Sequence, residues 1–213
     1  TMTSKKFNKL FNSEPRKPEE ELTQLQMDIA SSIQKVTEEI VLRIAKTVKD
    51  EMGVENLCLA GGVALNCVSN GKLIRSNLFK DIWIQPASGD AGGALGAALA
   101  VWHQYLNNPR NIEQPDSMRG SYLGACYANN EIKESLDGFD AVYEFIEDHE
   151  YEKEVAKILA NGNVVGWMQG SMEFGPRALG SRSILGDPRS PEMQTTMNLK
   201  IKYRESFRPF API

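Results

Sequence analysis

Two stretches near the carboxyl end combine arginine, glycine and proline with large apolar side chains: residues 172–183 (MEFGPRALGSRS) and residues 200–210 (KIKYRESFRPF). Glycine lets the backbone approach a ligand closely, and arginine grips phosphate or carboxylate at two points. Residues 171–213 hold seven basic side chains against four acidic ones, within a chain whose net charge is -4. These residue types predict the binding of an anion, and a nucleotide phosphate is the expected ligand.

A purely structural role is the alternative interpretation of the same residues. Glu173 and Glu205 lie within the two stretches and are available to pair with the arginines. Buried pairs of arginine and glutamate are costly to maintain, which favours a binding role for a nucleotide or for a ligand of the carbamoyl phosphate type.

Two glycine-rich turns in the first half each follow an apolar run that predicts a buried strand. Gly61 and Gly62 follow residues 56–60 and lead to Asn66, which is suited to contact a ribose or a base edge. The second turn, residues 86–98 (PASGDAGGALGAA), follows residues 81–85 and contains Asp90. Both turns are expected at the crevice where open α/β sheets bind ligands. Asp90 then serves either as a helix cap or as a ligand of a metal or a phosphate site.

The composition, with 41% hydrophobic and 24% charged residues, is that of an ordinary globular protein. The isoelectric point near 5.4 argues against a protein that coats nucleic acid. No apolar run reaches the length of a membrane span, and the three widely spaced cysteines indicate the reducing cytoplasm rather than a disulfide framework. Cys58 is expected to be a buried small apolar residue.

These motifs need elements to position them, and the first half predicts an α/β layer. Apolar residues spaced three or four apart from Leu22 to Met52 predict one long helix, with Pro18 in its first turn and Gly53 as its C-cap. Strands at 56–60 and 81–85 then alternate with helical segments, which predicts a mostly parallel sheet. Four units are expected along the chain: a disordered or loop lead-in at 1–17, a first domain at 18–106, a linker at 107–120 and a second α/β module at 121–213.

The second module is predicted as a mixture of short strands and helices. Its expected helices lie at 130–136, 151–160 and 191–200, and its expected strands lie at 122–124, 141–145, 164–169 and 182–185.

The motifs together closely resemble the O-carbamoyltransferases of nodulation and antibiotic biosynthesis, over residues 56–213. The glycine turns are shared with tRNA-threonylcarbamoylation ATPases, whereas the two arginine stretches are long and specific. The resemblance implies that residues 18–106 are the second half of an actin/Hsp70-like (Kae1-like) domain, which binds a divalent metal, usually iron, and an adenylate. It implies that residues 121–213 begin a YrdC-like domain, in which ATP and carbamoyl phosphate form carbamoyl adenylate. The carbamoyl group then passes to a substrate hydroxyl.

The resemblance also implies roles for individual residues. Asp90 matches the metal-binding aspartate of the family. Arg177 and Arg182 match catalytic arginines that bind phosphate. The remaining nucleotide- and phosphate-binding positions are Gly61, Gly62, Asn66, Gly92, Gly93, Lys202, Arg204 and Arg208. The expected partners are carbamoyl phosphate and a small hydroxyl-bearing acceptor, without nucleic acid or membrane, and the long helix is suited to form a homodimer.

The chain departs from the family pattern in three respects. It lacks the upstream histidine pair of the metal site, the first half of the Kae1-like domain and the expected end of the second domain. The expectation is therefore a truncated internal fragment that has no carbamoyltransferase activity in isolation. Two other functions stay open: a tRNA-threonylcarbamoylation type ATPase, and a non-catalytic actin/Hsp70-like nucleotide-binding module.

Overall fold

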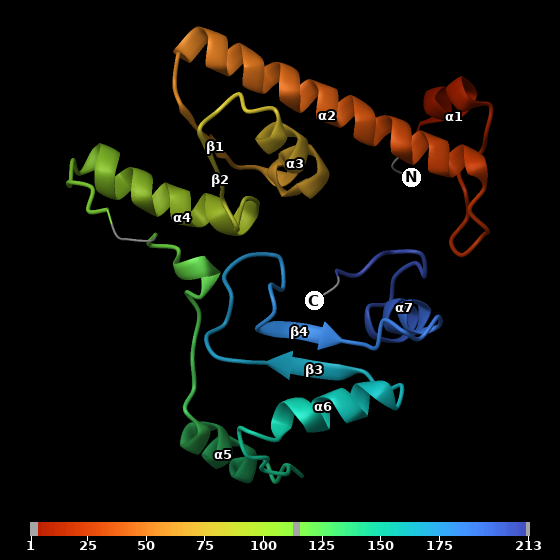
Figure 1. Ribbon diagram of the computed structural model, residues 1–213, viewed down its shortest axis with the longest axis vertical. Helices are drawn as coiled ribbons and strands as arrows, with labels where there is room; N and C mark the ends of the chain where they lie inside the picture. Colours follow the sequence, from red (N-terminus) through yellow and green to blue (C-terminus); the bar gives the residue numbers. More distant parts are fainter. Residues whose placement is uncertain (1–3, 113–115, 212–213) are drawn as a thin grey trace.

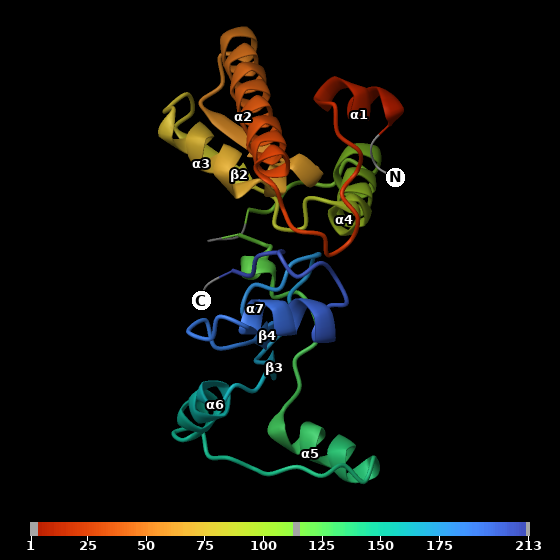
Figure 2. The same cartoon turned by 90° about the vertical axis from the view of Figure 1, so that its right-hand side faces the viewer.

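The structure, a computed structural model, describes residues 4–112 and 116–211. Figures 1 and 2 show two groups of elements at opposite ends of the molecule. The first group comprises α1 (Lys5–Phe11), α2 (Gln24–Met52), β1 (Asn56–Leu59), α3 (Cys67–Arg75), β2 (Asp81–Ile84) and α4 (Asp90–Ala100). The second group comprises α5 (Asn129–Gly138), α6 (Tyr151–Ala160), β3 (Val165–Met168), β4 (Arg182–Leu185) and α7 (Met193–Thr196).

Helix α2 is the long helix that the apolar stripe predicts, but it begins later than expected. Its first residue is Gln24 rather than a residue near Pro18, because Gln26 accepts a hydrogen bond of 2.9 Å from the backbone N–H of Thr23 and closes the first turn. The helix ends at Met52, and the left-handed φ of 62° at the next residue, Gly53, confirms the predicted C-cap.

The core of the first group lies between the carboxyl-terminal half of α2, α3 and the sheet. Ala45, Leu73 and Phe79 are its buried centre, and half-buried apolar side chains surround them: Val41, Leu42, Val48, Leu57, Leu59, Leu78 and Ile82. In the amino-terminal half of α2, the apolar side chains of Ile33, Val36 and Ile40 are exposed, so no other described residue covers this part of the helix.

Strands β1 and β2 form the predicted parallel pair, with Asn56 opposite Asp81 and Leu59 opposite Ile84. Burial alternates along both strands, so only one face of the pair packs against the core. Cys58 lies on the other face and is exposed, which contradicts the expectation that it is buried. The physical reason is that no described element covers this face of the sheet.

The second group is built on β3 and β4, which pair in the antiparallel direction from Val165 opposite Leu185 to Met168 opposite Arg182. Helix α6 covers β3, with the rings of Tyr151 and Trp167 5.8 Å apart. Helices α5, α6 and α7 lie where the sequence predicts helices.

Three expectations about local structure are wrong. The lead-in at 1–17 is not simply a loop, because α1 forms over Lys5–Phe11 with Ser4 as its N-cap. Residues 141–145 and 122–124 are not strands. Residues 141–145 have no partner strand among the described residues. An alternating pattern of side chains does not form a strand without a partner.

Candidate functional site

The two glycine turns of the first group lie side by side at the carboxyl ends of β1 and β2. The backbone N–H of Gly61 donates a 2.7 Å hydrogen bond to the carbonyl of Ser88, which ties the first turn directly to the second. Gly61 has a φ of 98°, a backbone conformation that residues other than glycine rarely adopt. The expectation that both turns share one edge of the sheet is therefore confirmed.

The glycines of the second turn differ in what they do. A Cβ on Gly92 would lie 1.8 Å from the carbonyl oxygen of Ala87, so only glycine fits at this position. Around Gly62 and Gly93, by contrast, the space that a Cβ would take is open. Gly92 thus packs α4 against its own preceding loop, whereas Gly62 and Gly93 line open surface.

Asn66 has a structural role in this structure. Its Oδ1 accepts a hydrogen bond of 3.1 Å from the backbone N–H of Ser69 and so caps α3, while its Nδ2 donates to Gln34 of α2 at 2.8 Å. Gln34 also donates to Glu38, which is 5% exposed and pairs with Lys72. The hydrogen bond from Lys72 is the main cause that lowers the pKa of Glu38. This polar cluster joins α2 to the first glycine turn.

Asp90 is the first residue of α4, immediately after the cap position that Gly89 occupies. Its side chain is exposed. Within the described residues, no group of three or more histidine, cysteine, aspartate or glutamate side chains is arranged to hold a metal ion. The metal-binding role of Asp90 stays a prediction.

Residues 173–182, which we call the arginine loop, are organised around a buried carboxylate. Glu173 is 2% exposed, and its Oε1 accepts hydrogen bonds from the backbone N–H groups of Leu179 (2.9 Å) and Ser181 (2.8 Å). Its Oε2 lies 3.4 Å from Nε of Arg182, and Nη2 of the same arginine donates a 2.6 Å hydrogen bond to the carbonyl of Gly175. Arg182 is thus held by the loop itself, whereas Arg177 is exposed.

The arginine loop contacts the second glycine turn across the two groups of elements. Gly175 has a φ of 121°, and a Cβ there would lie 3.2 Å from the Cβ of Ala87, which is fully buried. Together with the hydrogen bond between Gly61 and Ser88, this contact brings the two glycine turns and the first arginine stretch to one place. The contact between Gly175 and Ala87 depends on tertiary packing, and only the glycine itself hints at it in the sequence.

Residues 118–125 form a segment that is hydrogen-bonded to the beginning of the arginine loop. The sequence analysis did not predict this contact. The carbonyl of Ser121 accepts a 2.7 Å hydrogen bond from the backbone N–H of Phe174. Gly124 and Met172 approach so closely that a Cβ on Gly124 would lie 2.7 Å from Met172. Ser121 is fully buried and has a positive φ of 75°, which is rare for a residue other than glycine.

The second arginine stretch folds onto Asn198, a fully buried residue that the sequence analysis did not single out. Arg204 donates from Nε to Asn198 Oδ1 at 2.6 Å, and its guanidinium lies 4.9 Å from the centre of the Phe210 ring. Arg208 lies 3.5 Å from Glu205, which confirms that Glu205 pairs with an arginine. Lys202 is exposed.

Asp187 and Arg189 form a further pair beside β4 that sequence reasoning missed. Arg189 donates from Nε and Nη2 to the two carboxylate oxygens, at distances between 2.7 and 3.0 Å, and from its backbone N–H at 2.9 Å. The side-chain hydrogen bonds are the largest cause that lowers the pKa of Asp187 from 3.8 to about 2. The pair fixes the turn that follows β4.

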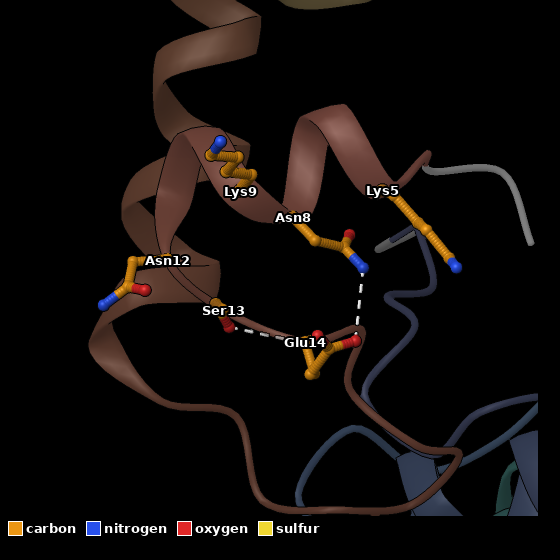
Figure 3. Close-up of a pocket in the computed structure, with 6 residues that line it drawn as sticks. All are labelled: Lys5, Asn8, Lys9, Asn12, Ser13 and Glu14. Carbon is orange, nitrogen blue, oxygen red and sulfur yellow. Dashed lines mark hydrogen bonds between the residues drawn. The ribbon is translucent and has the colours of Figure 1, made fainter.

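A hollow of about 550 Å³ lies beside α1 and is formed only by residues close together in the sequence (Figure 3). Asn8 donates to Glu14 across it at 3.3 Å. The hollow contains none of the predicted site residues. Among the described helices, none is both long enough and apolar enough to cross a membrane.

Comparison with known proteins identifies both halves of the chain. Residues 1–99 match the family model described as the carbamoyltransferase N-terminus, and residues 156–213 match the model described as the carbamoyltransferase C-terminus.

Curated relatives extend the comparison over the full length of the chain. An uncharacterized protein of Synechocystis sp. is 65% identical over 214 residues, which cover 100% of this chain and 35% of the relative. Nodulation protein NolO of Bradyrhizobium diazoefficiens is 44% identical over 205 residues, with 95% of this chain and 36% of the relative covered. Nodulation protein NolNO of Sinorhizobium fredii is 40% identical over 190 residues, with 89% and 28% covered. The chain thus spans about a third of the length of these relatives, and it belongs to the carbamoyltransferase family.

Proposed function

We propose that this chain is part of an ATP-dependent O-carbamoyltransferase. In this reaction carbamoyl phosphate, ATP and water give carbamoyl adenylate with release of phosphate and pyrophosphate. The carbamoyl group then passes to the hydroxyl of a small-molecule acceptor, and AMP leaves. The observation that carries the proposal is the contact between Gly175 and Ala87. It holds an arginine-rich loop against two glycine turns, so that groups suited to a phosphate and to a nucleoside meet at one place.

In this proposal the nucleotide binds at this junction. Open space beside Gly61 and Gly62 leaves room for a ligand against the backbone, and the exposed guanidinium of Arg177 is available for a phosphate. ATP supplies the adenylate that activates the carbamoyl group. In this proposal Arg177 binds phosphate oxygens and stabilises the negative charge that develops on the leaving phosphate. Arg182 holds the loop through Glu173 and Gly175.

The second arginine stretch has a similar division of labour in the proposal. Lys202 and Arg208 are exposed and supply positive charge to a polyanion. Arg204 is engaged with Asn198 and Phe210 and positions the stretch.

We propose a metal-binding role for one residue of this chain, Asp90. Asp90 is exposed at the start of α4 and is able to supply one ligand. The described residues supply no group of three ligands, so no step of the reaction is assigned to a metal within this chain. We also propose, from the resemblance, the Kae1-like and YrdC-like assignment of the two groups and a cytoplasmic location.

Calorimetric titration of ATP and of carbamoyl phosphate into the chain tests the proposal. Arg177→Ala is expected to weaken binding about tenfold or more, because a hydrogen-bonded charge pair contributes roughly 1.5–3 kcal/mol. Arg43→Ala, at an exposed position on α2, is the matched control and should bind like the unsubstituted chain. Unchanged affinity in Arg177→Ala, or no binding of either ligand to a chain whose circular dichroism shows it folded, contradicts the proposal.

A further inference from the structure

The segment between α1 and α2 reaches the second arginine stretch, although the two are far apart in the sequence (Figure 2). Nη2 of Arg16 lies 3.1 Å from Oε1 of Glu205, and its guanidinium lies 5.3 Å from the centre of the Phe207 ring. The side chain of Arg16 is only 12% exposed. The lead-in segment is therefore fastened to residues 205–207 rather than loosely placed.

Next to this ion pair, one residue captures a carboxylate at two points. Ser206 donates from its backbone N–H to Oε1 of Glu19 at 3.2 Å and from its hydroxyl to Oε2 at 2.8 Å. Both oxygens of the carboxylate are thus bound by a single residue. This donor arrangement suits any oxyanion that presents two oxygens, and phosphate is such an anion.

The backbone of Glu19 shows that this contact is held in place against a local preference. Its φ is 59°, in the left-handed region that residues other than glycine seldom adopt. Such a conformation persists only where the surrounding contacts enforce it, and the bonds to Ser206 are contacts of this kind. Loss of the hydrogen bonds to Ser206 therefore removes contacts that hold Glu19 in this conformation.

The surroundings of Ser206 leave room for an anion larger than a carboxylate. Arg16, which pairs with Glu205, brings a guanidinium group to this position. A hollow of about 340 Å³ adjoins it and is lined by Arg16, Glu19, Glu20, Glu21, Leu22, Ser206 and Phe207. Once Glu19 leaves, the donors of Ser206 face this space.

We propose that Ser206, with Arg16 beside it, is an oxyanion-binding site for a phosphate group, and that the carboxylate of Glu19 occupies it in the absence of ligand. Phosphate displaces Glu19, and residues 16–20 then detach from the arginine stretch. The inference rests on the proposed function only in taking this stretch as phosphate-binding. Because Glu19 competes with the ligand, it lowers the apparent affinity by the fraction of molecules in which the site is closed.

Titration of pyrophosphate, ATP and carbamoyl phosphate into the chain and its variants tests this site. Glu19→Gln keeps the size of the side chain but removes the charge, and it should bind at least one of these anions three- to tenfold more tightly. Ser206→Ala removes the hydroxyl donor and should weaken binding of that same anion. Glu21→Gln is the matched control, since Glu21 lines the same hollow and is exposed. The anion that responds most to Glu19→Gln is the one that uses the site.

Limited trypsin digestion reports the release of the segment independently. The bond after Arg16 is the site to follow, because the bond after Lys17 precedes Pro18 and resists trypsin. Saturating anion, or the Glu19→Gln change, should speed cleavage after Arg16 several-fold. Equal anion affinity in Glu19→Gln and the unsubstituted chain, or an equal gain in Glu21→Gln, overturns the inference. These outcomes are separate from the response to Arg177→Ala, which tests the proposed function.

Discussion

At the scale of single residues, several charged side chains near the candidate site bind the protein itself. Glu173 accepts two backbone N–H groups within the arginine loop, much as a bound anion would. Arg182 is held by its contacts with Glu173 and Gly175, and Arg204 is held by its hydrogen bond to Asn198. The motif therefore divides into residues that shape the loop and residues, Arg177 foremost, that are left to meet a ligand.

Asp187 provides a prediction about pH at the same scale. Its folded pKa of about 2 lies below the ordinary value of 3.8, chiefly because of the side-chain hydrogen bonds from Arg189. A depressed carboxyl pKa contributes stability above the unfolded pKa, and this contribution is lost as the pH falls from near 4 to near 2. Arg189→Gln should return the pKa of Asp187 toward its ordinary value and remove part of this acid sensitivity.

The measurement is the NMR titration of the Asp187 carboxyl, together with the denaturation midpoint at about pH 5 and about pH 2. The Arg189→Gln chain should be less stable at pH 5 and should lose less on acidification. Lys200→Gln changes charge equally at an exposed position and is the control. If Asp187 still titrated near pH 2 in Arg189→Gln, the arginine side chain would not be the cause of the lowered pKa.

At the scale of elements, two turns and one loop make the candidate site, and close backbone contacts hold them together. Gly175 is the clearest case, because both its φ of 121° and its approach to Ala87 exclude a side chain without adjustment. Gly175→Ala should lower the free energy of unfolding by roughly 1–3 kcal/mol through backbone strain. It should also weaken ATP binding, since it shifts the arginine loop away from the glycine turns.

Urea denaturation and the ATP titration measure the two effects. Gly138→Ala is the matched control, because Gly138 ends α5 with open space around it and without a positive φ. It should change stability by no more than about 1 kcal/mol, in the stabilising direction. If Gly175→Ala left both stability and ATP binding unchanged, the contact with Ala87 would not position the loop.

The sequence predicts elements well where a local signal suffices. The apolar stripe of α2 and the C-cap at Gly53 are local features, and the ranges 151–160 and 182–185 match α6 and β4 residue for residue. Residues 141–145 alternate like a strand but lack a partner to bond, which no local pattern reveals. The exposure of Cys58 has the same origin, because burial depends on which elements cover each face of a sheet.

The candidate site follows the same rule. The sequence predicts that glycine turns and arginines matter, since their residue types alone suggest close backbone approach and anion binding. It does not reveal that Asn66 pairs with Gln34, that Ser121 supports Phe174, or that Glu19 binds Ser206. Those pairs join residues between 32 and 187 positions apart, so only the folded chain brings them together.

At the scale of the whole molecule, the two groups of elements meet through few contacts. These include the ion pair of Arg16 with Glu205, the hydrogen bonds of Glu19 to Ser206 and the approach of Gly175 to Ala87. The buried cluster of Ala45, Leu73 and Phe79 belongs entirely to the first group. Scattered contacts of this kind couple two regions more weakly than a shared apolar core does, so the groups should open separately.

Leu73→Ala tests this separation, since Leu73 is fully buried in the first group. Removing its side chain should reduce the stability of that group by about 2–5 kcal/mol, through lost burial and a residual cavity. Hydrogen exchange followed by mass spectrometry should show faster exchange in α2, α3, β1 and β2, with β3 and β4 unchanged. Leu199→Ala, on an exposed position of the second group, is the control. Equal acceleration in all the strands would mean that the two groups unfold as one unit and that their polar contacts are stronger than their number suggests.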